Sequence, residues 1–324
     1  MVEQRTHAGR PLGYPQDVSS SDSSRPIASW RPGHFVWPGG RTKLVVVGGV
    51  GTRTGDAERS FAGLMRFLAE RAGYHVRHDL LEATYAGTAV GDRWEPRPYW
   101  PADTRRPLVD SVDAVAGALE WYRDVLPLRT RFCVLGYSLG GVVALDAATL
   151  AVARDRAGWR DRIAAVVTVA SPVRGCNAGP FIHWAWLATA EPDPLGVVGA
   201  ELDRRWRDPQ ERERVERRAA FLRAEGAVVV TLADPDDAVV RPDEAVLPAP
   251  GHSVDDLLVQ TDRVRPGSFG HGAILDEPAA WRRILAVIGP QQPLVVGRAG
   301  AAVDPIEHEL QALKARLRAE GRLK

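Results

Sequence analysis

The sequence predicts an α/β protein with a mostly parallel central sheet and helices on both faces. Short apolar runs, typical of strands buried on both faces, alternate with longer amphipathic segments typical of helices. This alternation continues along most of the 324 residues and contains no internal repeat. One apolar run, residues 132–135, passes through a glycine-rich turn directly into a helical segment. Together these features favour one large domain built from strand and helix units.

The expected elements follow one another in a regular order along the chain. Strands are expected at residues 43–47, 74–81, 132–135, 163–169, 227–232 and 256–262. Helices are expected at residues 56–72, 108–125, from residue 142 onward, and at 277–288. The connection between residues 169 and 227 is far longer than one helix needs. We therefore expect an inserted cap at about residues 174–226.

Both ends of the chain differ in composition from the expected domain at residues 41–290. Residues 1–40 are rich in Ser, Pro, Gly and Arg without periodicity, which predicts a flexible N-terminal arm. Residues 291–324 form a tail with an amphipathic segment at 305–318. We expect that segment to pack on the outside of the domain or between subunits, and the sequence does not determine the oligomeric state.

The composition favours a small-molecule partner in a reducing compartment. Forty-two basic residues balance 41 acidic ones, so neither nucleic acid nor an anionic membrane is an expected partner. Two cysteines, Cys133 and Cys176, are too few for a disulfide framework and are expected to be structural thiols. The first residues lack the apolar core of a signal peptide, and no stretch reaches the roughly 18 apolar residues of a membrane span. We therefore expect a cytoplasmic protein. We also expect no metal site, because no pair of histidines has the spacing of metal ligands.

The turn that follows residues 132–135 has the sequence Gly136-Tyr137-Ser138-Leu139-Gly140. A serine at a sharp strand-to-helix turn has a strained backbone, which requires small residues two positions before and two after it. The two outer glycines meet that requirement. The stretch resembles the nucleophile elbow of the α/β-hydrolase superfamily, and residues 41–290 are similar to bacterial lipases and esterases of that superfamily. The resemblance implies an α/β-hydrolase fold with Ser138 as the nucleophile.

A serine hydroxyl is a poor nucleophile at neutral pH, so it needs a base and a carboxylate that orients the base. In the family these residues follow in the order serine, acid, histidine. Asp237 comes soon after the strand at 227–232, and His271 follows the strand expected at 256–262. Because the carboxyl ends of parallel strands meet at one edge of a sheet, both side chains are expected to converge on Ser138.

Alternatives exist for the acid and for the base. Asp234 and Asp236 share the loop of Asp237. Asp237 is preferred because the apolar pair and the proline that follow it resemble the family pattern. His252 is the alternative base, but it precedes the last expected strand, whereas His271 follows it.

The loop after residues 43–47 contains Gly48-Gly49-Val50-Gly51. It does not fit a dinucleotide-binding G-x-G-x-x-G motif, because the third glycine comes one residue late, and we expect no cofactor. It resembles the His-Gly-X oxyanion loop of lipases and esterases, with Gly48 in place of the histidine. This resemblance implies that the N–H groups of Val50 and Leu139 bind the oxyanion, with Gly49 as the alternative to Val50. A plain strand-to-helix turn is the other interpretation.

Aromatic residues in two segments are candidates for the substrate pocket. In the expected cap, the run at residues 181–187 is either a wall of the pocket or a core helix; its candidate pocket residues are Phe181, Trp184 and Trp186. The loop at 83–107 borders the pocket or packs on the domain with Tyr85, Trp94, Tyr99 and Trp100. The arginine- and glutamate-rich stretch at 204–223 is expected to be a solvated helix with i,i+4 ion pairs.

The resemblance and the residue pattern together predict a serine hydrolase that cleaves a carboxylic ester through Ser138, Asp237 and His271. The same residues also suit a thioesterase or an acyltransferase. A catalytically silent binding protein on the same fold is the alternative from a different class.

Overall fold

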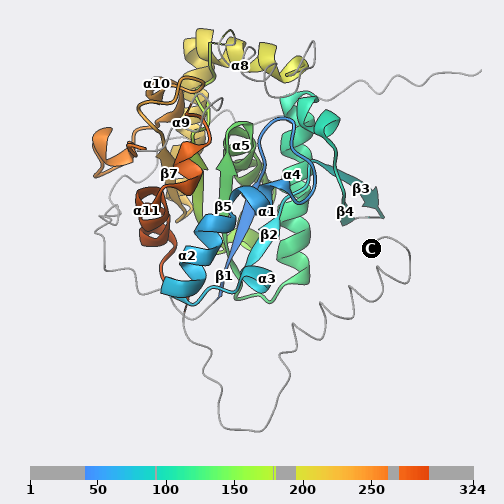
Figure 1. Ribbon diagram of the computed structural model, residues 1–324. Helices are drawn as coiled ribbons and strands as arrows, with labels where there is room; N and C mark the ends of the chain where they lie inside the picture. Colours follow the sequence, from blue (N-terminus) through green and yellow to red (C-terminus); the bar gives the residue numbers. More distant parts are fainter. Residues whose placement is uncertain (1–40, 92, 178, 180–194, 262–269, 292–324) are drawn as a thin grey trace, which may run out of the picture.

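The computed structural model describes residues 41–91, 93–177, 179, 195–261 and 270–291, and its centre is a five-stranded sheet (Figure 1). The strand order is β2-β1-β5-β6-β7, and each neighbouring pair is parallel. The strands are β1 (Thr42–Val47), β2 (Leu80–Glu82), β5 (Arg131–Tyr137), β6 (Ile163–Val169) and β7 (Val228–Leu232). Every residue of β1 and of β6 is buried, as the unbroken apolar runs predicted.

Helices cover both faces of this sheet. On one face, α5 (Leu139–Arg154) packs against α4 (Leu108–Val125) and α9 (Pro209–Ala224). On the other face, α2 (Ala62–Ala72) packs against α11 (Pro278–Ile288). The short elements are α1 (Asp56–Ser60), α3 (Val76–Asp79), α6 (Arg156–Trp159), α10 (Pro242–Ala245), η1 (Pro101–Arg105), η2 (Asp255–Leu257) and η3 (Ala273–Asp276). This parallel sheet between two helical layers confirms the predicted α/β-hydrolase fold.

The register of the sheet determines which loops lie side by side. Val47, the last residue of β1, pairs with Gly136 near the end of β5. The two strands therefore end at the same edge, and the loop that begins at Gly48 lies beside the turn at Ser138.

Two expected strands differ in the structure. Residues 74–81 contain the short helix α3 before the three-residue strand β2. The side chain of Asp79 explains the helical turn, because its carboxylate accepts a hydrogen bond from the His75 N–H at 2.8 Å and pairs with Lys43 at 2.9 Å.

The prediction of a strand at residues 256–262 is also wrong for residues 256–261, which the structure describes. The chain there forms the 3-10 turn η2 and a single bridge between Ala233 and Leu258. The carboxylate of Asp256 accepts hydrogen bonds from the backbone N–H of Ser253 at 2.8 Å and from its hydroxyl at 2.9 Å. These local bonds replace a strand ladder with a turn.

Other expected elements are corrected in detail. The helix expected at 56–72 is divided into α1 and α2 at Phe61. The loop expected at 83–107 contains an antiparallel hairpin of β3 (Ala86–Val90) and β4 (Arg93–Arg97), followed by η1.

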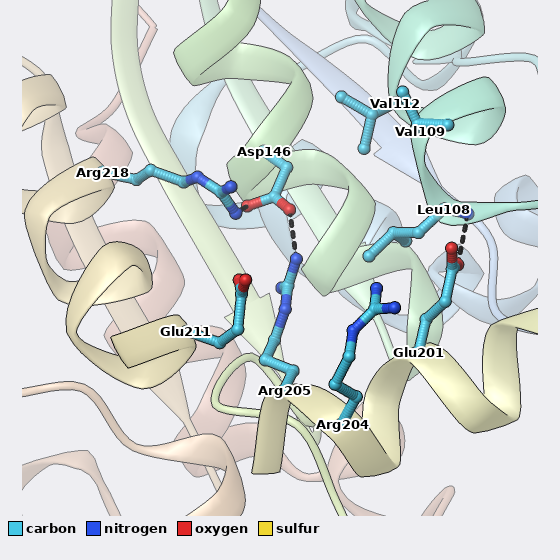
Figure 2. A pocket seen from close by; sticks show the side chains of 9 residues that line it. All are labelled: Leu108, Val109, Val112, Asp146, Glu201, Arg204, Arg205, Glu211 and Arg218. Carbon is cyan, nitrogen blue, oxygen red and sulfur yellow. Dashed lines mark hydrogen bonds and ion pairs between the residues drawn. The ribbon is translucent and has the colours of Figure 1, made fainter. Parts of the chain in front are cut away.

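Two helices, α8 (Val197–Arg207) and α9, lie in the segment where we expect a cap, and a buried aspartate ties both to α5 (Figure 2). The carboxylate of Asp146 pairs with Arg205 of α8 at 2.6 Å and with Arg218 of α9 at 2.8 Å. Burial opposes ionisation of Asp146, but the two guanidinium groups outweigh it and hold the pKa of this carboxyl below its ordinary value. We expected the arginine-rich stretch to be a solvated helix, but Arg205 and Arg218 face the buried Asp146. The expected i,i+4 ion pairing does occur on the exposed side, between Glu213 and Arg217.

None of the helices in the described part of the chain combines the length and the apolar character that a bilayer span requires.

Candidate active site

Ser138 lies at the turn between β5 and α5, in a backbone conformation that non-glycine residues rarely adopt. Its φ is 55° and its ψ is −132°. A Cβ on Gly136 would lie 2.3 Å from the Gly140 carbonyl oxygen, and a Cβ on Gly140 would lie 2.3 Å from the Val47 carbonyl oxygen. Both positions therefore require glycine, which is the physical reason for the sequence pattern around the serine.

The imidazole of His271 connects Ser138 to an acid. Its Nε2 lies 3.0 Å from the Ser138 Oγ, and its Nδ1 lies 2.7 Å from the Asp237 Oδ2. The side chains of His271 and Asp237 are buried. When Nδ1 carries the proton and donates to the carboxylate, Nε2 is left as the acceptor for the serine hydroxyl.

Asp237 is oriented by the backbone that follows it. Its Oδ1 accepts hydrogen bonds from the N–H groups of Val239 at 2.8 Å and Val240 at 3.0 Å. These two bonds fix one carboxylate oxygen and leave the other facing His271.

The alternative acids have other partners. The carboxylate of Asp234 accepts hydrogen bonds from the Asp236 N–H at 3.0 Å and from the Thr261 hydroxyl at 2.5 Å, and burial raises its pKa. Asp236 accepts a hydrogen bond from the Gln260 side chain. The alternative base, His252, lines a pocket between β7 and α11. The structure thus brings Asp237 and His271 to Ser138.

The loop after β1 packs directly on the serine. A Cβ on Gly49 would lie 3.1 Å from the Ser138 Cβ and 3.6 Å from its Oγ, so a side chain here would crowd the nucleophile. Val50 follows in the same loop, and Leu139 begins α5 directly after Ser138. No described residue accepts a hydrogen bond from the backbone N–H of Val50 or of Leu139. Both groups are therefore candidates for binding an oxyanion.

The predicted pocket residues have different outcomes. Phe181, Trp184 and Trp186 lie outside the described residues. Tyr85 and Tyr99 are buried and pack against each other, which fits the packing interpretation of their segment. Trp100 is 63% exposed.

The two cysteines are structural, and the acidic, histidine and cysteine side chains of the described residues form no metal site. Cys133 and Cys176 are buried and free, and burial raises the pKa of the Cys133 thiol to about 12, so neither suits nucleophilic chemistry. Over the described ranges, no group of three or more His, Cys, Asp or Glu side chains is arranged to hold a metal ion.

Sequence reasoning missed the role of Tyr137. Its hydroxyl donates to the His271 carbonyl oxygen at 3.1 Å, and its ring lies 5.1 Å from the imidazole. It also missed Asp146, the hydroxyl contacts of Thr52 and the bond from Tyr85 to the glycine loop. The contacts of Tyr137, Asp146 and Tyr85 join segments far apart in the sequence, so no local pattern signals them.

Comparison with known proteins gave matches among solved structures alone, since no family model and no curated protein matches this chain. Phospholipase PlaB from Legionella pneumophila is 14% identical with a TM-score of 0.35; the match covers 60% of this chain and 39% of the phospholipase. The chain thus spans well under half of that protein's length.

Two further solved structures match over more of their length. Est1E from Butyrivibrio proteoclasticus is 13% identical with a TM-score of 0.42, and the match covers 78% of this chain and 90% of Est1E. A lipase-esterase related protein from Clostridium acetobutylicum is 14% identical with a TM-score of 0.41, over 76% of this chain and 94% of that protein.

Proposed function

We propose that this chain is a serine hydrolase that cleaves carboxylic esters. The observation that carries the proposal is the continuous chain of contacts from Asp237 through His271 to Ser138, with distances of 2.7 and 3.0 Å, at a strained strand-to-helix turn. An acid, a neutral imidazole and a serine in this arrangement constitute the machinery of nucleophilic acyl transfer.

In the first half of the reaction, the Ser138 Oγ attacks the acyl carbon of the ester while the His271 Nε2 takes the serine proton. The carbonyl oxygen becomes an oxyanion, which the N–H groups of Leu139 and Val50 stabilise. His271 then gives its proton to the departing alcohol oxygen as the ester C–O bond breaks. The products of this half are an acyl-enzyme on Ser138 and a free alcohol.

In the second half, water attacks the acyl-enzyme and His271 takes the proton of that water. Collapse of the second oxyanion releases the carboxylic acid, and His271 returns the proton to Ser138. Asp237 stabilises the imidazolium in both halves of the reaction. Two backbone N–H groups fix the Oδ1 of Asp237, so its Oδ2 stays directed at the Nδ1 proton of His271.

The test compares acyl donors on the purified chain. Wild type and Ser138→Ala are assayed with p-nitrophenyl acetate, butyrate and octanoate, and with a butyryl thioester. We expect ester turnover that Ser138→Ala abolishes, with a higher kcat/KM for the butyrate ester than for the butyryl thioester. A thioester preferred over its matched ester contradicts the ester assignment, and no turnover of any acyl donor contradicts the hydrolase assignment.

A further inference from the structure

Two hydroxyl groups hold the carbonyls of the glycine loop beside Ser138. The Tyr85 hydroxyl donates to the Gly48 carbonyl oxygen at 2.6 Å. The Thr52 hydroxyl donates to the Gly49 carbonyl oxygen, also at 2.6 Å. These carbonyls belong to the peptide groups that carry the N–H of Gly49 and the N–H of Val50.

The two hydroxyls and the serine contact different parts of the loop. A Cβ on Gly48 would meet the Thr52 Oγ1 at 2.6 Å and the Tyr99 hydroxyl at 3.1 Å. A Cβ on Gly49 would instead meet the Ser138 Cβ at 3.1 Å. One side of the loop therefore faces the hydroxyls of Thr52 and Tyr99, and the other side faces Ser138. Glycines at positions 48 and 49 permit the close approach on each side.

The residues behind the loop are themselves held in place. Tyr85 is fully buried with its ring 5.2 Å from that of Tyr99, and burial keeps the pKa of its hydroxyl well above the ordinary value, so the group remains a donor. Tyr99 donates to the Glu82 carboxylate at 3.2 Å. Glu82 in turn accepts hydrogen bonds from the N–H groups of Gly55 at 2.5 Å and Ala57 at 3.1 Å. The far end of the loop is thereby tied to the same carboxylate that accepts from Tyr99.

Peptide geometry connects these bonds to the reaction. The C=O and N–H of a trans peptide point in opposite directions, so holding a carbonyl towards Tyr85 or Thr52 directs its partner N–H away from them. A peptide released from such a bond can rotate and present its carbonyl oxygen instead. Without the Thr52 hydroxyl, the Gly49 carbonyl oxygen keeps only the longer hydrogen bond from the Thr52 backbone N–H, at 3.4 Å. A carbonyl oxygen repels the negative charge that develops in acyl transfer.

We propose that Tyr85 and Thr52 are positioning residues that keep the Val50 N–H oriented towards the oxyanion, Thr52 through the peptide that carries this N–H and Tyr85 through the peptide before it. This inference rests on the proposed serine hydrolase function. Neither side chain contacts the substrate, and each acts through a carbonyl of the loop. Their removal should weaken binding of the transition state and leave binding of the ground-state ester nearly unchanged.

The test uses Tyr85→Phe and Thr52→Val, with Thr52→Ser as the conservative variant. Tyr74→Phe is the matched control, because the buried Tyr74 hydroxyl also donates to a backbone carbonyl, that of Gly289, at 3.1 Å. The measured quantities are kcat and KM for p-nitrophenyl butyrate, the Ki of an alkyl trifluoromethyl ketone, and the Tm. Addition of the Ser138 Oγ to that ketone, with its proton passing to His271, forms a hemiketal oxyanion that reports on the loop directly.

We expect Tyr85→Phe and Thr52→Val each to lower kcat by about 10- to 100-fold and to raise the ketone Ki by a similar factor, with KM within about twofold of wild type. Thr52→Ser should remain close to wild type. Tyr74→Phe should lower the Tm about as much as Tyr85→Phe does, without changing kcat.

Unchanged kcat and Ki in Tyr85→Phe and Thr52→Val, in an enzyme that Ser138→Ala inactivates, would overturn the positioning role alone. A lowered kcat without a weaker ketone Ki would overturn it as well. If wild type turns over no ester, the proposed function fails, and this inference fails with it. Should Tyr85→Phe not fold, the pair Thr52→Val and Thr52→Ser decides the question.

Discussion

Two buried aspartates, Asp237 and Asp146, have the same side chain and nearly the same burial but different partners. Asp237 accepts two backbone N–H bonds and faces one imidazole. Asp146 faces two guanidinium groups, from Arg205 and Arg218. A guanidinium is permanently charged, whereas an imidazole gains its charge when it takes a proton. The difference fits a structural role for Asp146 between helices and the role we propose for Asp237 beside an imidazole that gains and loses a proton.

This comparison separates activity from stability. Changes around Asp237 should reduce turnover in a protein that remains folded. Changes around Asp146 should reduce the free energy of unfolding while the folded molecules keep their turnover number.

The largest effect is expected at the nucleophile. Ser138→Ala should lower kcat by at least about 10³-fold, because serine and histidine act as one unit. Its Tm should stay close to that of wild type, because the substitution removes a single hydroxyl and its hydrogen bond with the His271 Nε2. Turnover is measured with p-nitrophenyl butyrate and the Tm by circular dichroism. Turnover close to wild type would contradict the mechanism.

The next effect distinguishes the two aspartates of one loop. Asp237→Asn should lower kcat by about 10²- to 10⁴-fold, because an amide neither stabilises the imidazolium nor selects the required tautomer. Asp234→Asn should change kcat by less than about threefold, since Asp234 faces Thr261 and the Asp236 N–H. Equal losses in the two variants would remove the support for Asp237 as the acid.

The opposite outcome, lower stability with unchanged turnover, is expected at Asp146. Asp146→Asn removes the counter-charge that Asp146 supplies to the buried Arg205 and the partly buried Arg218, which should lower the free energy of unfolding by about 3–5 kcal/mol. Arg204→Ala is the control. This exposed arginine of α8 lines the same pocket as Asp146, Arg205 and Arg218, and it forms no ion pair with any described residue (Figure 2). Urea denaturation measures both variants, and kcat per folded molecule should stay within about twofold. A stable but inactive Asp146→Asn would reverse the comparison.

A smaller, graded effect is expected in acid. The pKa of Asp146 is lowered in the folded state, so its ion pairs stabilise the fold above the ordinary carboxyl pKa of about 4. This contribution should disappear as the pH falls below about 4 and through the lowered folded-state pKa. Urea denaturation between pH 7 and pH 3 should show a shallower acid loss in Asp146→Asn than in wild type. Identical slopes would show that Asp146 does not contribute.

The contrast also explains what the sequence predicted and what it missed. The turn at Ser138 was predictable because its glycines are required by contacts within a few residues, and these contacts leave a local pattern. Asp146 lies in a helix whose neighbours in space are α8 and α9, and no spacing in the sequence shows that these helices cross α5. For the same reason no pattern signalled the hydrogen bond from Tyr85 to Gly48, because these residues lie 37 positions apart in the sequence.

The misassigned strand has a local cause that apolar periodicity does not include. Residues 257–259 form an apolar run that favours a strand, but the hydrogen bonds between Ser253 and Asp256 form a turn instead. The prediction of His271 did not depend on a regular strand at residues 256–262. It required only that the chain return to the edge of the sheet where Ser138 lies.

Covalent labelling tests most directly the central claim that His271 and Asp237 activate Ser138. Intact-mass and peptide spectrometry would follow the reaction of wild type, Asp146→Asn and His271→Ala with an alkyl fluorophosphonate, which modifies activated serines. We expect one adduct on the Ser138 peptide in wild type and in Asp146→Asn, and none in His271→Ala over the same time. An adduct on another residue, or equal labelling of His271→Ala, would contradict it.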